Sequence, residues 1–212
     1  MENKEALNFF KLMSQNSDDP KSVKLAKSSD FSQMDADFIM KFAHKKSKIM
    51  DLGSGTGLII NKIYDKVGSI TAIEPFVPFT KFINQSDNIK VVNQTFDEYV
   101  IGEFDYDMVT IFGTMHYFNE NEAIDIYKKF FLVLKNGGKI IVKNQFGVKE
   151  DVVVEGYSEE QKCNYYAQYR KIDKEVLCLK NIGYKNAQVY DIYPPECNRW
   201  ENTHFYAIVA EK

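Results

Sequence analysis

The stretch Ile49-Met50-Asp51-Leu52-Gly53-Ser54-Gly55-Thr56-Gly57 joins an apolar run to an acidic residue and a glycine-rich turn. Glycine has no Cβ, so the backbone can turn tightly and a ligand can approach it closely. We expect a strand over 48–52, then the turn, then a helix over 57–66 whose unpaired N–H groups face the ligand. The pattern predicts a site for a nucleotide-like ligand.

The composition fits one α/β domain that needs neither disulfides nor metal. The chain has 212 residues, 44% of them hydrophobic, and a net charge of −3. This charge argues against nucleic-acid binding, which uses a basic face. The sequence contains no apolar run of 18 residues, so we expect no membrane-spanning helix. Cys163, Cys178 and Cys197 form no C-x-x-C motif, so we expect reduced thiols, no metal site and a cytoplasmic location.

Strand patterns and helix patterns alternate along the chain. This alternation predicts a doubly wound, mostly parallel α/β sheet. The last two strands have no helix between them, so they can pair only antiparallel, as a C-terminal hairpin. The further expected strands cover 69–74, 89–93, 106–112, 139–143, 185–192 and 204–210, and the further expected helices cover 3–15, 32–44, 79–84, 120–134 and 174–180.

We expect a single domain over 1–212 with four parts. Residues 1–45 form an N-terminal helical cap that either covers the ligand site as a lid or packs on the sheet edge. Residues 46–144 form the ligand-binding core. Residues 145–170 are a polar, tyrosine-rich insertion without strong periodicity, and residues 171–212 supply the last helix and the hairpin.

Four strand ends are expected to meet at one edge of the sheet, where such folds bind ligands. The first is Asp51 with the glycine turn. The second is Glu74, whose carboxylate can accept both hydroxyls of a ribose. The third is 93–96, where Phe96 can flank an adenine ring, and the fourth is 113–117.

The spacing of the glycines distinguishes between ligands. A dinucleotide fold favours G-x-G-x-x-G, whereas this chain has G-x-G-x-G with Leu58 in the sixth place. Asp51 directly before the turn suits a cationic ligand with an ammonium and a sulfonium better than a pyrophosphate. A nicotinamide-dependent oxidoreductase is therefore the weaker alternative.

Several motifs in order resemble class I S-adenosylmethionine-dependent methyltransferases, chiefly over residues 45–145. They are the stretch 51–57, Glu74, Phe104-Asp105-Tyr106-Asp107-Met108-Val109, Met115-His116-Tyr117-Phe118 and Leu134-Lys135-Asn136-Gly137-Gly138. The resemblance implies a seven-stranded Rossmann-like sheet and S-adenosylmethionine as cofactor. The residues it implies for cofactor binding are Asp51, Gly53, Ser54, Gly55, Gly57, Glu74, Pro75, Thr95, Phe96, Gly113 and Thr114. Thr95 stands where the family often has an aspartate that reads the adenine amine.

The C-terminal third contains an aromatic cluster and the only two arginines of the chain. Arginine is a planar fork that suits carboxylate and phosphate groups. This part resembles small bacterial methyltransferases that tailor capsular and surface polysaccharides, including those of phosphoramidate pathways. We therefore expect a small acceptor of sugar, phosphate or phosphoramidate type, with Tyr117, Tyr165, Tyr169, Arg170 and Arg199 as acceptor-binding residues.

A phosphate or carboxylate acceptor needs no base, whereas a sugar hydroxyl or an amine does. His116 and His204 are the candidate bases because imidazole titrates near neutral pH. The simpler alternatives are that His116 only shapes the cofactor loop, that His204 is a satisfied, half-buried side chain and that the arginines form ordinary ion pairs. A catalytically inactive module that binds S-adenosylmethionine is the alternative function.

Overall fold

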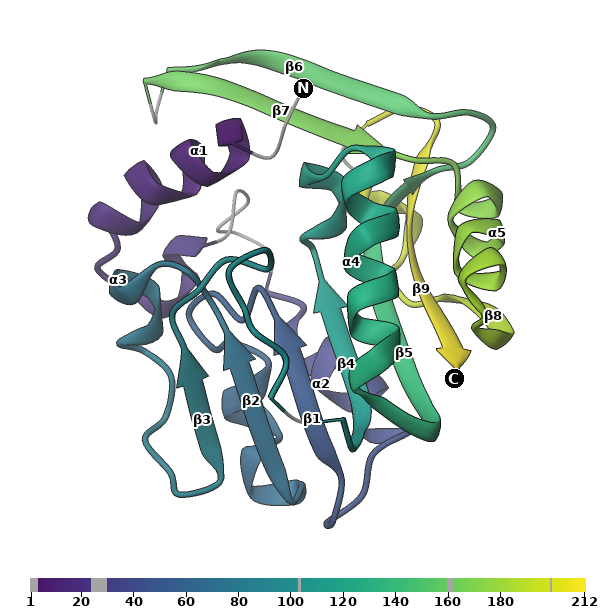
Figure 1. The fold of residues 1–212 in the computed structure, drawn as a ribbon. Coiled ribbons are helices and arrows are strands. Elements are labelled where there is room, and N and C mark those ends of the chain that lie inside the picture. Colours follow the sequence, from purple (N-terminus) through teal and green to yellow (C-terminus); the bar gives the residue numbers. More distant parts are fainter. Residues whose placement is uncertain (1–3, 24–29, 103, 160–161, 199) are drawn as a thin grey trace.

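The protein is described by a computed structural model over residues 4–23, 30–102, 104–159, 162–198 and 200–212. Its centre is a seven-stranded sheet in the order β3-β2-β1-β4-β5-β9-β8 (Figure 1). Strands β1 to β5 are parallel, and β9 runs antiparallel to both β5 and β8. This confirms the predicted fold class. The strands are β1 Lys48–Leu52, β2 Ser69–Ile73, β3 Ile89–Val92, β4 Tyr106–Phe112, β5 Leu134–Gly147, β8 Lys185–Asp191 and β9 Thr203–Glu211.

Helices cover both faces of the sheet because its central strands are apolar on both sides. Helices α4 (Glu120–Val133) and α5 (Ile172–Ile182) pack on one face, over a core that includes Phe130 and Leu179. Helix α2 (Ser32–Met40) packs on the opposite face with Phe38 and Ile39. No helix in the described part of the chain is long and apolar enough to cross a bilayer.

The helix expected over 57–66 does not form. The segment contains two short 3-10 helices, η2 (Ile60–Lys62) and η3 (Tyr64–Lys66). The side chain of Asn61 donates to the carbonyl of Phe82 at 2.8 Å and accepts from the amide of Asn84 at 2.8 Å. These bonds anchor the segment to the loop after α3, and the β-branched isoleucines around Asn61 have a low helix propensity. The glycine turn is therefore not followed by an α-helix N-terminus.

Other boundaries differ by a few residues from the expected ones. Helix α2 ends at Met40 instead of residue 44, and α3 is only Val77–Thr80. Helix α5 begins at Ile172 instead of residue 174, and Gly183, which follows its last residue Ile182, is in the left-handed conformation. Glycine is common at that position because it has no Cβ to clash.

The insertion at 145–170 is more regular than its sequence indicates. It contains an antiparallel hairpin, β6 (Val152–Ser158) and β7 (Cys163–Tyr169), which we call the β6–β7 arm. The arm lies above the strand tips, and helix α1 (Lys4–Gln15) lies beside it (Figure 1). The ring centroids of Phe9 and Tyr165 are 5.5 Å apart, and those of Phe10 and Tyr117 are 5.0 Å apart. Helix α1 therefore packs against the arm through Phe9, and against the loop after β4 through Phe10.

A capping box fixes the start of α4. The side chain of Asn119 accepts from the amide of Glu122 at 3.0 Å, and the carboxylate of Glu122 accepts from the amide of Asn119 at 2.8 Å. These bonds satisfy two helix-end groups that would otherwise lack partners.

Replacement of this cap should lower stability measurably. We expect Asn119→Ala to reduce the free energy of unfolding by about 1 kcal/mol, because a helix N-cap contributes about that amount. Urea denaturation followed by circular dichroism measures the loss. Asn121→Ala, on the exposed side of the same first turn, is the matched control and should change stability by less than about 0.5 kcal/mol. Equal losses in both variants would contradict the role of the cap.

Candidate functional site

A cavity of about 520 Å³ lies at the carboxyl ends of the parallel strands. Its size is within the usual range for sites that enclose small molecules, roughly 300–1,000 Å³. The turns after β1, β2, β3 and β4 all contribute to its lining, as the sequence predicts. Helix α1 and the short helix η1 (Pro20–Val23) contribute Phe10 and Val23 from the N-terminal segment. These side chains cover part of the cavity, while α2 of the same N-terminal part packs on the sheet, so a lid over residues 1–45 stays a prediction.

The glycine turn is shaped to bring the backbone against the cavity. Gly53 and Gly55 have φ values of +74° and +54°, which side chains disfavour. A Cβ on Gly53 would lie 2.6 Å from the hydroxyl oxygen of Thr114, so the β4 loop packs directly on this glycine. Ser54 also lines the cavity, whereas Gly57 does not. Thr56 donates from its hydroxyl to the carbonyl of Pro20 and so ties the N-terminal segment to the turn.

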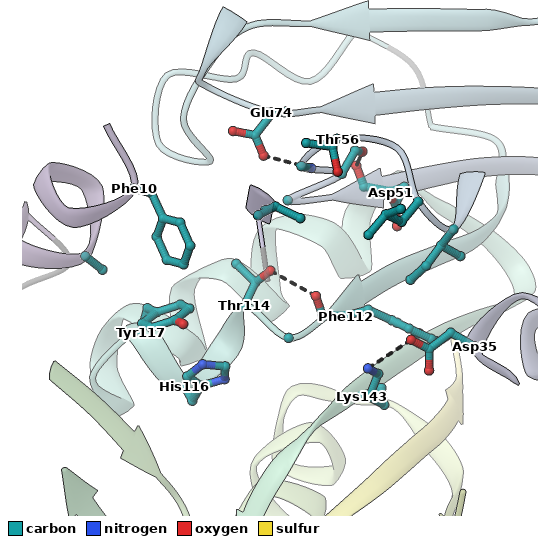
Figure 2. A pocket seen from close by; sticks show the side chains of 18 of the residues that line it. Phe10, Asp35, Asp51, Thr56, Glu74, Phe112, Thr114, His116, Tyr117 and Lys143 are labelled. Carbon is teal, nitrogen blue, oxygen red and sulfur yellow. Dashed lines mark hydrogen bonds and ion pairs between the residues drawn. The ribbon is translucent and has the colours of Figure 1, made fainter. Parts of the chain in front are cut away.

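Glu74 links the first two strand ends. Its carboxylate accepts from the backbone N–H of Gly55 at 2.9 Å and from that of Phe76 at 3.0 Å. Figure 2 shows Glu74 beside the glycine turn. The side chain is buried, and this loss of hydration raises the pKa of Glu74 from 4.5 to about 7, against the opposite effect of the two hydrogen bonds. The negative charge of Asp51 contributes a smaller increase.

Asp51 places a second buried carboxylate in the same cavity. It accepts from the hydroxyl of Thr110 on β4 at 2.5 Å, and burial raises its pKa above the ordinary value. Two buried carboxylates beside a glycine turn are costly without a cation. The arrangement favours a ligand that brings positive charge and hydroxyl donors.

The third strand end adds Thr95 and Phe96 to the lining of the cavity, and the turn after β2 adds Pro75. The ring of Phe96 stacks on Phe118 with a centroid distance of 5.4 Å, which holds it in place. Asp97, which the sequence analysis did not select, also lines the cavity, so a carboxylate is present two residues beyond Thr95.

The fourth strand end brings a histidine to the cavity. Gly113 and Thr114 line it, and His116 and Tyr117 follow in η4 (Met115–Tyr117). Nδ1 of His116 lies 3.3 Å from the side-chain oxygen of Asn144, and the imidazole stacks on Tyr169 at 5.3 Å. An Nδ1–H that donates to Asn144 leaves the lone pair on Nε2, which is the form able to accept a proton.

The structure does not bring His204 to the cavity. Nε2 of His204 lies 2.7 Å from the carboxylate of Asp191, and Nδ1 lies 2.9 Å from the side-chain nitrogen of Asn198. Both ring nitrogens are engaged, so the simpler alternative, a satisfied and buried histidine, describes this residue.

Arg170 is also a structural residue, contrary to the expectation that it binds the acceptor. The side chain is 5% exposed and does not line the cavity. It donates to both carboxylate oxygens of Glu175, at 2.6 and 2.8 Å, and to the carbonyls of Met115 and Phe118. These bonds fasten the β4 loop to α5. A charged side chain with so many buried partners cannot leave them for a ligand.

Of the other residues expected to bind the acceptor, two line the cavity and one packs against helix α1. Tyr117 and Tyr169 line the cavity. Tyr165 is not among the lining residues and instead packs on Phe9 of α1. Arg199 lies outside the described residues.

A buried triad that the sequence analysis missed occupies the end of the cavity away from Glu74 (Figure 2). Lys143 on β5 forms an ion pair with Asp35 on α2 at 3.0 Å and donates to the hydroxyl of Tyr193 at 2.9 Å. Tyr193 in turn donates to Asp35 at 2.6 Å. Lysine is abundant in this chain and these residues are far apart in sequence, so no local pattern indicates that they meet.

Comparisons with known proteins agree with this site. Residues 49–138 match a family model described as a methyltransferase domain. No curated protein sequence matches the chain. The fold is similar to those of many solved structures, and three of them, each below 15% identity, illustrate the likeness. A SAM-dependent methyltransferase from Leishmania major has a TM-score of 0.75 at 14% identity, covering 98% of this chain and 82% of its own. A DhpI complex with SAM and HEP has a TM-score of 0.74 at 11% identity, and the match covers 99% of this chain and 97% of that one. An S-adenosylmethionine-dependent methyltransferase from Mesorhizobium loti has a TM-score of 0.66 at 11% identity, and the match covers 85% of this chain and 98% of that one.

The family match coincides with the part of the chain that carries the glycine turn, Glu74 and the β4 loop. Together with the similar structures, which carry SAM or SAH or are described as SAM-dependent, it confirms the predicted enzyme class, a methyltransferase, and the predicted cofactor, S-adenosylmethionine. The solved structures support the fold and leave the acceptor undecided.

The ion pair of Arg170 yields a stability prediction. Arg170→Met should lower the free energy of unfolding by about 3–5 kcal/mol, because it leaves Glu175 buried without its cation. Urea denaturation measures the loss, and the double variant Arg170→Met/Glu175→Gln should recover part of it. The affinity of the folded fraction for S-adenosylmethionine should stay within twofold of the wild type. A stable Arg170→Met protein would contradict the structural role.

Proposed function

We propose that this protein transfers a methyl group from S-adenosylmethionine to a small acceptor of anionic or sugar type that is enclosed in the cavity. The observation that carries the proposal is the continuity of the cavity. It runs from the glycine turn and Glu74 to a second polar group, Lys143, and aromatic side chains enclose it. A cofactor and a small acceptor can then meet inside one enclosed space.

The residues present fit the cofactor. Glu74 would accept the ribose hydroxyls, and Pro75 with Phe96 would flank the adenine. Asp51, Gly53 and Gly113 would surround the methionine end, where a buried carboxylate suits the cationic ammonium and sulfonium. The raised pKa values of Glu74 and Asp51 support this assignment, since both carboxylates are under-compensated without a cation.

The bound cofactor supplies an activated methyl group for an in-line displacement. The contribution of the protein is alignment and exclusion of water. Orientation of this kind can supply roughly 7–11 kcal/mol of a barrier. An anionic oxygen needs no base. For a hydroxyl acceptor, His116 would take the proton at Nε2 while Asn144 holds Nδ1.

From the sequence, the two arginines are the reason to expect an anionic acceptor. In the described part of the structure, the cation that faces the cavity is Lys143. Arg170 is engaged elsewhere, and Lys143 is the only cationic side chain among the described residues that line the cavity. The narrower proposal, tailoring of capsular or surface polysaccharide and of phosphoramidate groups, depends on the resemblance of the C-terminal third alone. The proposed cytoplasmic location depends on the expected reduced cysteines.

Turnover separates the proposed enzyme from a module that only binds the cofactor. Isothermal titration with S-adenosylmethionine should show one site per chain. An acceptor screen with sugars, sugar phosphates, carboxylates and phosphoramidates, read by mass shift, should yield S-adenosylhomocysteine and a product heavier by one methylene. His116→Ala should lower turnover with a hydroxyl acceptor by about 10²–10⁴-fold, the usual contribution of a general base. Cofactor binding without any product from the whole screen would favour the inactive module.

Cofactor binding should strengthen as pH rises through about 7. The ribose hydroxyls donate to the ionised form of Glu74, whose pKa is raised to about 7, so binding must release its proton at lower pH. The same shift means that the free protein loses stability as the pH rises from about 4.5 to 7, because Glu74 ionises in the unfolded chain while it stays protonated in the folded protein.

The matched variant is Glu74→Gln, which keeps the side-chain size. It should weaken binding by about 10–100-fold near pH 8, since a hydrogen bond to a charged group contributes about 1.5–3 kcal/mol. It should also remove the part of the pH dependence centred near 7. Titration calorimetry from pH 5.5 to 8.5 measures both effects. An unchanged pH profile in the variant would exclude Glu74 as its source.

A further inference from the structure

The triad of Lys143, Asp35 and Tyr193 is enclosed by aromatic rings. The ammonium of Lys143 lies 4.8 Å from the ring centroid of Tyr193, 5.3 Å from that of Phe112 and 5.9 Å from that of Phe205. The rings of Tyr193 and Phe205 touch, with centroids 5.1 Å apart. Lys143 is 8% exposed and Asp35 is 4% exposed. The ammonium is therefore fixed by packing, cation–π contacts and an ion pair.

The hydrogen bonds of the triad leave one donor. A lysine ammonium has three N–H groups. Within the described chain, the hydroxyl of Tyr193 accepts one of them at 2.9 Å, and the carboxylate of Asp35 lies 3.0 Å from the nitrogen as an ion pair. Tyr193 uses its own proton on Asp35, and Asp35 uses one oxygen for each partner. Because all three side chains line the cavity, the triad can offer a ligand one further N–H. The ammonium of Lys143 therefore suits a ligand that presents one oxygen atom better than a ligand that presents several.

The charges around the cavity disfavour a multiply charged anion. The described lining has carboxylates on Asp35, Asp51, Glu74, Asp97 and Glu196, and one ammonium on Lys143. A phosphate dianion would meet several carboxylates and a cation that Asp35 already neutralises in part. The rings of Phe112, Tyr193 and Phe205 face the ammonium of Lys143 and Phe31 packs on Tyr193, while polar side chains such as Gln145 and Asn198 also line the cavity. Such a wall matches a ring or another apolar body.

The triad lies beyond the expected position of the cofactor. Lys143 pairs with Phe112 on β4, and β4 separates β5 from β1. Neighbouring strands are about 4.8 Å apart, so Lys143 lies about 10 Å across the sheet from the strand that carries the glycine turn. Figure 2 shows Glu74 and the Asp35–Lys143 pair toward opposite sides of the cavity. An acceptor placed at the triad would be directed toward the β4 loop.

We propose that Lys143, held by Asp35 and Tyr193, recognises the acceptor, and that the acceptor is a small ring-bearing molecule with a single anionic oxygen of carboxylate or phenolate type. This inference rests on the proposed function, because the molecule bound at Lys143 is an acceptor only if the protein transfers a methyl group to it. It narrows the acceptor class, and it disfavours phosphate esters and neutral sugars. Lys143 binds the anionic oxygen, Asp35 and Tyr193 position Lys143, and the aromatic wall receives the ring.

Benzoate is the probe for this subsite. Saturation-transfer NMR titrations of the full chain should detect benzoate binding, with phenyl phosphate and methyl glucoside binding at least tenfold more weakly. Lys143→Met, which keeps the apolar stem, should weaken benzoate binding by tenfold or more. Lys139→Met is the matched control, since Lys139 is on the same strand and only pairs with Glu211 at the surface. The control should bind benzoate within twofold of the wild type.

A second variant addresses folding, because Lys143→Met leaves Asp35 buried without its cation. Asp35→Asn/Lys143→Met removes both charges and should remain folded in urea denaturation, yet it should lose benzoate binding to the same degree. The affinity for S-adenosylmethionine, measured by calorimetry, should stay within twofold in every variant.

The outcomes decide the inference separately from the proposed function. Absent benzoate binding in the wild type, equal binding in Lys143→Met, or preferred binding of phenyl phosphate or methyl glucoside would overturn the subsite. A loss of cofactor affinity in Lys143→Met as large as its loss of benzoate would assign Lys143 to the cofactor instead. The benzoate titrations are run with and without S-adenosylhomocysteine. A wild type that binds no cofactor would refute the proposed function, while the titrations without cofactor would still decide the subsite.

Discussion

The geometry of the site depends on one buried carboxylate. Glu74 follows β2 and accepts from the amide of Gly55 in the turn after β1 and from the amide of Phe76 in its own turn. Two turns from neighbouring strands are thereby held against each other. The two hydrogen bonds do not fully offset the loss of hydration, so the pKa of Glu74 stays near 7 in the free protein. The carboxylate that joins the two turns is therefore also a group that a ligand with hydroxyl donors and a positive charge would stabilise.

The two ends of the cavity differ in how their buried charges are balanced. At the cofactor end, Asp51 and Glu74 are buried without a cationic partner among the described residues, and a cationic ligand would complete the site. At the other end, Lys143 is already paired with Asp35 and surrounded by rings. A buried ion pair of this kind contributes little net stability, so its value lies in the orientation of the ammonium. The N-terminal segment encloses both ends through Phe10, Phe31 and Asp35.

Much of the fold could be predicted because its signals are local. Apolar runs, a capping residue such as Asn119 and a helix-ending Gly183 act within a few residues of chain, and strand ends in a parallel sheet must meet at one edge. The helix expected over 57–66 failed because Asn61 makes side-chain bonds to a distant loop. The β6–β7 arm was missed because its stability comes from packing on α1, which sequence periodicity does not report.

The sequence by itself determined the order of strands and helices, the parallel sheet, the acidic glycine turn and the carboxylate at the end of β2. It therefore indicated the cofactor class, because those features are contiguous and their chemistry follows from residue type and spacing. Only the tertiary structure decided which cation faces the cavity. Arg170 is rare in the chain yet lies buried against Glu175, whereas Lys143 is one of many lysines and lies beside Asp35 and Tyr193. The role of a charged side chain depends on its burial and its partners, and the two partners of Lys143, Asp35 and Tyr193, are 158 residues apart in the sequence.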